Sequence, residues 1–494
     1  MGAIGWEMPG RIGEKASPKF VTRALSGHSA LGLTTAAFLY LLTVSGIISV
    51  FNHELQRWEQ PGAPELASIT PEAAERAAIS MLTLEDIPTS HFFIHLPTDD
   101  LPRVVLTTDT RAVVTDGAGT IVTEEAHPWT QFVLDLHFYL HLPEKVGLTV
   151  VGMLGVLLLG SSISGFLAHP SIFRDAFAFR FSGSARLAQA DLHNRLSVWT
   201  SPFHISIALT GAVLGLASIT AFAIATLDHE GNTEAVFAPV FGEEPTRDDE
   251  PAPLAGIARA LTYMQTEHPD IVATYVIMHE PKTKGQHLQV LGIHERRLVF
   301  GEYYNFDQSG EYIRTVGMTD GKIGQQIVAS IYPLHFGSFG GLPVKAAYAL
   351  FGVILCYIVS SGFNIYLLKQ REKGSDVLRL EAAWTGVMWG TPVALSLAML
   401  GSVTGTIPAA ALPTVFWLSL GLALFIAITA PKWKLLGQWL RGGTGVVLLI
   451  ATFAHLFVHK ESFASPAATN TTIVFVVIAL AFLVPLIRVP LTSR

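Results

Sequence analysis

The sequence contains little cysteine and little charge. Its one cysteine among 494 residues, Cys356, lies inside an apolar stretch, which excludes a disulfide bond within the chain. Charged residues make up 14% of the chain and hydrophobic residues 50%, whereas about a quarter of the residues of an average soluble protein are charged. With a mean hydropathy of +0.44, this composition predicts a membrane protein.

Motifs of several common enzyme classes are also missing. The chain has no G-x-G-x-x-G dinucleotide motif, no Walker phosphate loop, no C-x-x-C-H haem attachment motif and no H-E-x-x-H zinc motif. These absences leave nicotinamide or flavin chemistry, ATP hydrolysis, covalently bound c-type haem and zinc-dependent hydrolysis without support.

Apolar stretches long enough to cross a membrane occur eight times. About 20 apolar residues span a bilayer as a helix, and the stretches that qualify cover residues 28–51, 134–168, 192–226, 333–368, 380–404, 410–430, 440–458 and 470–489. Lys and Arg precede the first stretch, follow the last, and occur in the loops after the second, fourth and sixth. By the positive-inside rule, these loops and both termini face the cytoplasm. The first stretch is too long for a cleaved signal peptide, so we expect an uncleaved anchor.

Two long polar segments, 52–132 and 227–331, are then expected on the exported side. Asp and Glu outnumber Lys and Arg by 13 to 4 in the first and by 16 to 8 in the second, which gives net charges of −9 and −8. This acidity favours cationic or metal-bearing partners over nucleic acid, although it also serves solubility alone. A helix start at Thr70-Pro71 and a strand, turn, strand pattern around Asp116-Gly117 predict α+β domains.

The chain contains two similar halves, one after the other. His28 lies 17 residues before the serine of Ser45-Gly46, and His193 lies 17 residues before the threonine of Thr210-Gly211. After each polar segment, a second apolar stretch opens with Leu-His-Phe and closes with Ser-Gly-Phe. These motifs are Leu136-His137-Phe138, Leu334-His335-Phe336, Ser164-Gly165-Phe166 and Ser361-Gly362-Phe363. Their order predicts a tandem duplication.

Two tandem copies that each cross the membrane out and back place equivalent residues at equal depth. His28 and His193 then lie near the cytoplasmic ends of outgoing helices, and His137 and His335 lie near the exported ends of returning helices. Ionisable residues in membrane segments usually mark functional sites, and imidazole is a common ligand of haem iron. We therefore predict two b-type haems, each held by one pair through its iron. For each residue, a hydrogen-bonded buried histidine is the alternative.

Further histidines complicate this assignment. His141 follows His137 by four residues and is expected on the same helical face, where it could replace His137 or contact a haem propionate. His204 follows His193 by eleven residues and is expected about 20° around and roughly 16 Å further along the helix, where it could bind the deeper haem or hydrogen-bond within the bundle. His455 and His459 are spaced as a metal pair but lack a visible third ligand, which favours an interfacial role.

Residues 24 to about 372 resemble the PepSY-associated transmembrane-helix proteins. The motifs that carry the resemblance are residues 27–33 (GHSALGL) with Ser45-Gly46, the openings Leu136-His137 and Asp191-Leu192-His193, and residues 334–341 (LHFGSFGG). The family includes iron-regulated inner-membrane proteins and ferric-siderophore reductases with two b-type haems. The resemblance therefore implies an inner-membrane reductase with PepSY-like modules in the periplasm, and it leaves the four C-terminal spans without a role.

The predicted fold is an α-helical integral membrane protein of about eight spans, with a tandem-duplicated four-helix haem-binding core and two exported α+β PepSY-like domains. The predicted parts are 1–51 (N-terminus and first span), 52–132 (first exported domain), 133–226 (second and third spans), 227–331 (second exported domain), 332–372 (fourth span) and 373–494 (about four further spans).

Three functional classes are compatible with these features. A di-haem reductase that passes electrons across the inner membrane to a periplasmic acceptor, such as a ferric siderophore, accounts for both the paired histidines and the acidic domains. Its electron donor would lie in the cytoplasm or the membrane. A non-enzymatic PepSY module that binds or inhibits an exported protein accounts only for the domains. A permease would use the eight spans, but no paired intramembrane carboxylates indicate a transport site. No feature indicates nucleic-acid binding.

Overall fold

The computed structural model describes residues 17–85, 88–169, 171–177, 185–242, 247–294, 298–299, 301–319, 321–431, 435–460 and 465–487. Eight helices within these residues are long and apolar enough to cross a membrane, which confirms the eight predicted stretches. They are α1 (Pro18–Ser49), α5 (Glu144–Ala168), α8 (Ser201–Asp228), α12 (Gly341–Glu372), α13 (Leu378–Val403), α14 (Leu412–Thr429), α15 (Leu436–Val458) and α16 (Pro466–Ile487). The chain is a multi-pass membrane protein.

Three of the predicted spans are each built from two helices. The helices α4 (Pro128–Tyr139), α7 (Ala185–Trp199) and α11 (Ile323–Phe336) precede α5, α8 and α12. After α4 the backbone enters the left-handed region at Leu140 and His141, both with φ of 56°. After α11 it does so at Gly337 and Gly340, where glycine adopts this conformation without strain. These turns tilt the short helices away from the long ones.

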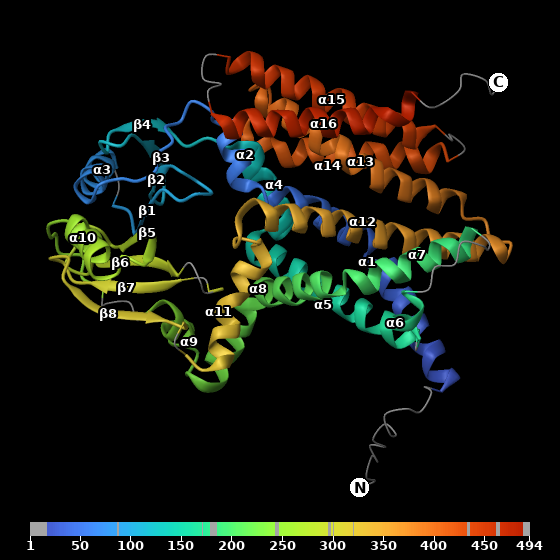
Figure 1. Cartoon of the computed structure of the whole chain (residues 1–494), viewed down its shortest axis with the longest axis horizontal. Helices are drawn as coiled ribbons and strands as arrows, with labels where there is room; N and C mark the ends of the chain where they lie inside the picture. Colours follow the sequence, from blue (N-terminus) through green and yellow to red (C-terminus); the bar gives the residue numbers. More distant parts are fainter. Residues whose placement is uncertain are drawn as a thin grey trace, which may run out of the picture.

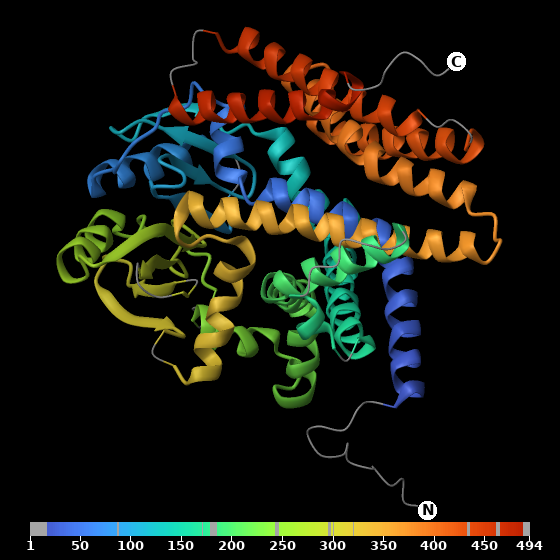
Figure 2. The ribbon, with the colours of Figure 1, turned by 45° about the vertical axis from the view of Figure 1, so that its right-hand side comes forward.

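The long helices form two bundles that lie side by side. In the first, α1 packs against α5 and α12, and α5 packs against α8, so each long helix of the first half contacts one of the second half. Gly152 and Gly215 allow α5 and α8 to approach closely, because a Cβ atom on Gly152 would lie 2.8 Å from the Gly215 carbonyl carbon. The second bundle, α13–α16, packs against α1, α4 and the short helix α2 (Asn52–Glu59) and forms a separate layer (Figures 1 and 2).

The two polar segments share one sheet, although the sequence pattern predicts two separate domains. All neighbouring strands are antiparallel, and the order is β4-β3-β2-β1-β5-β6-β7-β8. The strands are β1 (His91–His95), β2 (Val104–Thr107), β3 (Ala112–Thr115), β4 (Ile121–Glu124), β5 (Ile271–His279), β6 (His287–His294), β7 (Glu302–Phe306) and β8 (Tyr312–Gly317). The two halves join at β1 and β5, where Ile94 faces Val276. Such pairing depends on contacts between distant segments, which local patterns do not reveal.

One face of this sheet is covered by two helices. They are α3 (Pro71–Leu84) and α10 (Ile257–Glu267), and with the inward side chains of the strands they enclose an apolar core. The predicted start of α3 is confirmed, because Thr70 Oγ1 accepts a hydrogen bond of 3.3 Å from Ala73 N. Alternate residues of the central strands, such as Phe92 and Ile94, are fully buried, as period-two patterning requires.

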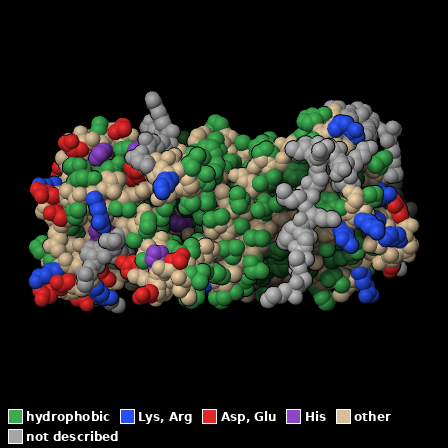
Figure 3. Space-filling view, turned by 90° about the horizontal axis from the view of Figure 1, so that it is seen from below, with side chains coloured by type: hydrophobic (Ala, Val, Ile, Leu, Met, Phe, Trp, Pro, Cys, Tyr) green, Lys and Arg blue, Asp and Glu red, His purple; other side chains and the backbone are tan. Residues whose placement is uncertain are grey.

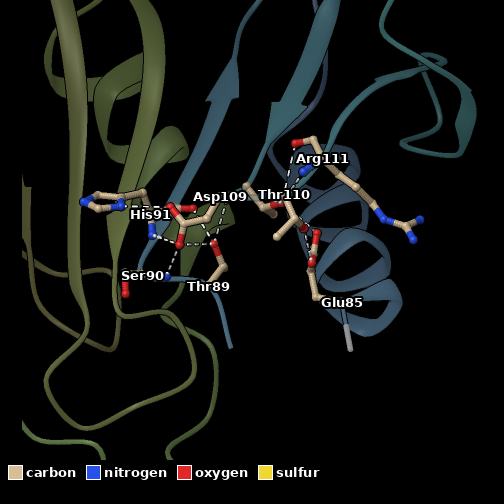
Figure 4. Close-up of polar contacts among 8 residues, drawn as sticks. Glu85, Thr89, Ser90, His91, Asp109, Thr110 and Arg111 are labelled. Atoms are coloured by element: carbon tan, nitrogen blue, oxygen red, sulfur yellow. Dashed lines mark hydrogen bonds and ion pairs between the residues drawn. The ribbon is translucent and has the colours of Figure 1, made fainter. Parts of the chain in front are cut away.

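A carboxylate fixes the strand at this junction. Asp109, which follows β2, accepts hydrogen bonds from Ser90 N at 2.6 Å and Thr89 Oγ1 at 3.0 Å, and His91 Nδ1 lies 2.9 Å away (Figure 4). Burial alone would raise the pKa of Asp109, but the hydrogen bonds from His91, Ser90 and Thr89 outweigh it and lower the pKa to about 2. The ionised carboxylate therefore anchors the entry to β1.

The two ends of the molecule differ in the sign of their charged side chains. The sheet lies at one end of the helices, which we call the sheet end (Figure 1). Figure 3 shows a broad hydrophobic band, with Asp and Glu gathered at the sheet end and mainly Lys and Arg at the opposite end. A band of this kind matches the hydrocarbon layer of a bilayer between two polar surfaces.

Candidate functional site

The four mirrored histidines lie together as two pairs. The ring centroids of His28 on α1 and His193 on α7 are 6.3 Å apart, at the end opposite the sheet. Those of His137 on α4 and His335 on α11 are 6.2 Å apart, at the sheet end. Each pair takes one histidine from each half of the duplication, so neither half contains a complete pair on its own.

Each imidazole is held by a backbone carbonyl of a neighbouring helix, and this carbonyl always belongs to the residue four positions before a glycine. Nδ1 lies 2.9 Å from Ser161 O for His28, 3.0 Å from Leu42 O for His137 and 3.1 Å from Ile358 O for His193, and His335 bonds the backbone of Ile207. The corresponding glycines are Gly165, Gly46, Gly362 and Gly211. We call this carbonyl, together with the Ser/Thr-Gly dipeptide that follows it, the seat of the imidazole. The same kind of seat occurs at all four places.

A hydroxyl residue directly before each glycine completes the seat. Its oxygen lies within hydrogen-bond distance of the same carbonyl, at 3.1 Å for Ser45, 2.9 Å for Ser164, 3.3 Å for Thr210 and 3.0 Å for Ser361. Ser45 and Thr210 lie closer still to the carbonyl one residue earlier, at 3.0 and 2.7 Å. Three of these hydroxyls also lie 3.0 to 3.4 Å from the Nδ1 atom of the seated histidine. Such contacts orient a ring and hold it in one tautomer.

The glycine of each seat supplies the space that the ring occupies. A Cβ atom would lie 2.8 Å from His137 Cε1 on Gly46 and 2.9 Å from His335 Cε1 on Gly211. On Gly165 and Gly362 it would lie 3.2 Å from Cε1 of the facing histidine. The repeated Ser/Thr-Gly dipeptides are visible in the sequence, but their role as seats depends on which helices become neighbours.

This arrangement suits ligation of a metal by paired imidazoles. An Nδ1–H donated to a carbonyl leaves the Nε2 lone pair available for a metal. If each Nε2 atom bound a metal at about 2.0 Å, two opposed rings would be separated by about 6.2 Å, because each nitrogen lies about 1.1 Å from its ring centre. Both observed separations match this value. Within the described residues, no group of three or more His, Cys, Asp or Glu could hold a metal ion.

A cavity of about 320 Å³ borders the pair at the sheet end. Its walls are apolar side chains of α1, α4, α5, α8, α11 and α12, together with Tyr332 and Tyr348. Five glycines are among the lining residues: Gly46, Gly155, Gly211, Gly215 and Gly352. An apolar cavity with two inward imidazoles fits a planar, largely apolar ligand that carries a central metal.

Residues 25–369 match the family described as the PepSY-associated TM region. The chain belongs to this family. An uncharacterized protein of Pseudomonas aeruginosa is 26% identical over 353 residues, which cover 67% of this chain and 87% of the relative. The family match, residues 25–369, contains all four seats and both histidine pairs, and it ends within α12. The bundle α13–α16 of this PepSY-associated protein therefore lies outside the matched region.

His141 does not share a helical face with His137, so that expectation is wrong. In the PepSY-associated protein, α4 ends at Tyr139, and the left-handed turn that follows redirects the chain. The ring of His141 stacks on Phe132, with centroids 4.9 Å apart, and His141 is absent from the walls of the cavity.

His204 does not continue the helix of His193. The chain turns at Thr200 between α7 and α8, so the angular and axial offsets expected for one continuous helix do not apply. His204 is buried, with Nδ1 3.4 Å from Thr200 Oγ1, and it does not line the cavity either. Sequence periodicity missed this break because a single non-helical residue leaves the apolar pattern unchanged.

A polar cluster at the sheet end was not predicted. The buried Lys345 Nζ on α12 lies 2.8 Å from Glu54 Oε1 on α2 and 3.2 Å from Asp100 Oδ1 in the loop after β1. The pKa of the neighbouring His53 is lowered to about 4, mainly by burial and secondly by the Lys345 charge. The cluster ties the sheet of the PepSY-associated protein to its membrane helices.

Proposed function

We propose that this protein is a di-haem membrane reductase that transfers electrons across the bilayer to an acceptor on the sheet side. The observation that carries the proposal is the pair of bis-histidine arrangements at opposite ends of one bundle, each with ring separations suited to an iron between them. His28 and His193 would hold one haem, and His137 and His335 the other. When bound, haem supplies one-electron transfer.

The two pairs lie at well separated depths. His28 and Ser45 are 17 residues apart on α1, which corresponds to about 26 Å along the helix. Because Ser45 contacts His137, the two pairs lie near the two surfaces of the hydrocarbon layer. Two one-electron centres stacked in this way would divide the membrane into shorter electron-transfer steps.

We place the sheet in the periplasm and the Lys- and Arg-rich end in the cytoplasm, following the positive-inside rule. We propose a bacterial inner membrane as its location, with both termini in the cytoplasm. The acidic sheet end then faces the exported acceptor and concentrates cationic ligands there. The electron donor would meet the protein at the cytoplasmic end or within the membrane.

Aromatic side chains lie beside the sheet-end pair. Phe336, adjacent to His335, stacks on Tyr332 with centroids 4.2 Å apart, and both line the cavity.

A ferric siderophore is the acceptor class that we favour. Ferric iron in the chelate would gain the one electron that the donor loses and become ferrous. Siderophores hold ferrous iron more weakly, so the metal would be released for separate uptake. Since electron transfer depends on cofactor placement and potential, this step needs no general acid and no nucleophile.

The protein purified in detergent tests the proposal directly. Pyridine haemochrome analysis should give two haems per chain, and a ferric hydroxamate added to the chemically reduced protein should reoxidise the haems. A ferrous-specific chelator should trap the product, whereas the gallium hydroxamate should leave the haems reduced. A colourless protein would refute the reductase and favour a non-enzymatic module that binds an exported protein. Haems that stay reduced with a panel of ferric siderophores would point to another exported acceptor.

A further inference from the structure

The C-terminal bundle contacts the helix that carries one proposed haem ligand. The helix α4, with His137 near its end, has no side-chain hydrogen bond at its own N-cap, His127. Unpaired N–H groups at a helix start need acceptors. A carboxylate from another helix supplies them, because Glu59 of α2 accepts from Trp129 N at 2.9 Å, from Thr130 N at 2.7 Å and from Thr130 Oγ1 at 2.5 Å.

The residue beside Glu59 is embedded in the C-terminal bundle. Trp58 is fully buried, its ring stacks on His455 of α15 with centroids 3.8 Å apart, and its Nε1 donates to Thr472 Oγ1 of α16 at 3.1 Å. Two consecutive residues of α2 thus contact two different parts of the protein. Trp58 contacts α15 and α16, and Glu59 contacts the start of α4.

Two further contacts connect α4 directly to the same bundle. Trp129 Nε1 donates to Leu395 O of α13 at 3.3 Å, and Phe132 packs on Phe416 of α14 with centroids 5.7 Å apart. The equivalent helix of the second half, α11, is capped locally, because Gln325 Oε1 accepts from Lys322 N at 2.8 Å. The two helices that carry His137 and His335 are therefore held in different ways.

We infer that the C-terminal bundle holds His137 in place through Trp58 and Glu59 and so tunes the haem at the sheet end. This inference rests on the proposed function for its redox consequence, but not for the mechanical coupling. Glu59 is a positioning residue: its carboxylate fixes the start of α4, and α4 places the imidazole seven residues beyond Thr130. The inference gives α13–α16 a role, although they lie outside the region that matches the family.

The test measures the motion of α4 and the two haem potentials separately. In full-length Glu59→Ala, amide hydrogen exchange across residues 129–139 should rise roughly tenfold, the scale of a lost helix cap. Thr472→Val removes the acceptor of Trp58 without changing side-chain volume, and it should raise the same exchange roughly threefold. The matched control is Glu85→Gln, since Glu85 also binds two hydroxyls but lies in the sheet region. It should leave α4 unchanged.

The potential of the sheet-end haem should shift in Glu59→Ala and Thr472→Val, while that of the opposite haem stays at the wild-type value. If exchange in α4 matches the wild type in Thr472→Val, the coupling to the C-terminal bundle is refuted, even where Glu59→Ala raises it. If exchange rises but both potentials stay constant, the tuning of the haem is refuted. A protein without haem would refute the proposed function alone, because the exchange experiment would still report the coupling.

Discussion

The ring of His137 lies so close to Gly46 that a Cβ atom there would be 2.8 Å from its Cε1 atom. We therefore expect Gly46→Ala to displace the imidazole from its seat and to lower the occupancy of the sheet-end haem, with a loss of about 1–3 kcal/mol in stability from overpacking. Pyridine haemochrome and thermal unfolding measure the two effects. Gly32→Ala on the same helix is the control, because nothing lies within 4 Å of its added Cβ; equal haem loss in both would contradict this role.

Replacing the histidines one at a time separates the two sites. His28→Ala or His193→Ala should remove the haem opposite the sheet, and His137→Ala or His335→Ala should remove the other, since each pair shares one iron. Haem content should fall from two to one per chain, with a different absorption band remaining in each group. The His204→Ala variant should keep both haems, because His204 is not one of the four seated histidines and does not line the cavity. Loss of both haems in every variant would indicate general misfolding instead.

The hydroxyl of Thr210 gives a milder test of the seat. Its Oγ1 lies 3.0 Å from His335 Nδ1, and residues that orient a metal-binding imidazole commonly contribute about 10- to 100-fold in metal affinity. Thr210→Val should lower haem affinity at the sheet end by roughly tenfold, measured by transfer of haem to apomyoglobin. Thr226→Val on the same helix removes a hydroxyl that bonds Phe222 O within its own helix and should have no effect. Identical transfer rates would show that the carbonyl alone orients the ring.

The tandem repeat was predictable from the sequence because its chemistry recurs at fixed spacing. The eight membrane helices also follow from length and apolarity alone. The four histidines were identified because each stands out in an apolar stretch. The seats could not be identified, because the carbonyl of Leu42 carries no signature and becomes an acceptor only when α4 packs on α1.

The helix breaks and the shared sheet were not predictable for a related reason. Leu140 and His141 adopt left-handed conformations that non-glycine residues rarely take, so their composition gives no turn signal. β1 and β5 belong to different polar segments, and they pair only when the two halves of the chain come together. No local pattern in either segment indicates this pairing. Glu59 likewise resembles an ordinary surface glutamate in the sequence, although it is buried against α4.

Lys345 should contribute strongly to the attachment of the sheet. Its ammonium group is buried between Glu54 and Asp100, so Lys345→Met would leave two carboxylates without their counter-charge. Because the two carboxylates are partly exposed, the cost should fall below the roughly 3–5 kcal/mol of a fully buried ion pair. We expect a lower unfolding temperature with increased proteolysis of the sheet. The triple variant with Glu54→Gln and Asp100→Asn should recover part of the loss. No recovery would mean that the packing of the Lys345 stem, rather than its charge, stabilises the attachment.

Glu59 should make the stability of the protein depend on pH near neutrality. Burial raises the pKa of Glu59 from 4.5 to about 7, and the hydrogen bonds from Thr130 and Trp129 only partly offset this. Between pH 4.5 and 7 the folded state therefore retains a proton that the unfolded state releases, so the free energy of unfolding falls as pH rises through this window, by roughly 3 kcal/mol in all.

The Glu59→Gln variant should lose this part of the pH dependence. Unfolding temperatures measured in detergent from pH 5 to pH 8 should fall more steeply for the wild type than for the variant, and the two slopes should become equal above about pH 7, where Glu59 is ionised in both states. His127 beside it has a pKa lowered to about 4, mainly by burial, and opposes the effect of Glu59, but it is present in both proteins and cancels in the comparison. Parallel curves over the whole range would show that Glu59 is already ionised at pH 5 in the folded protein, which would contradict a pKa of about 7.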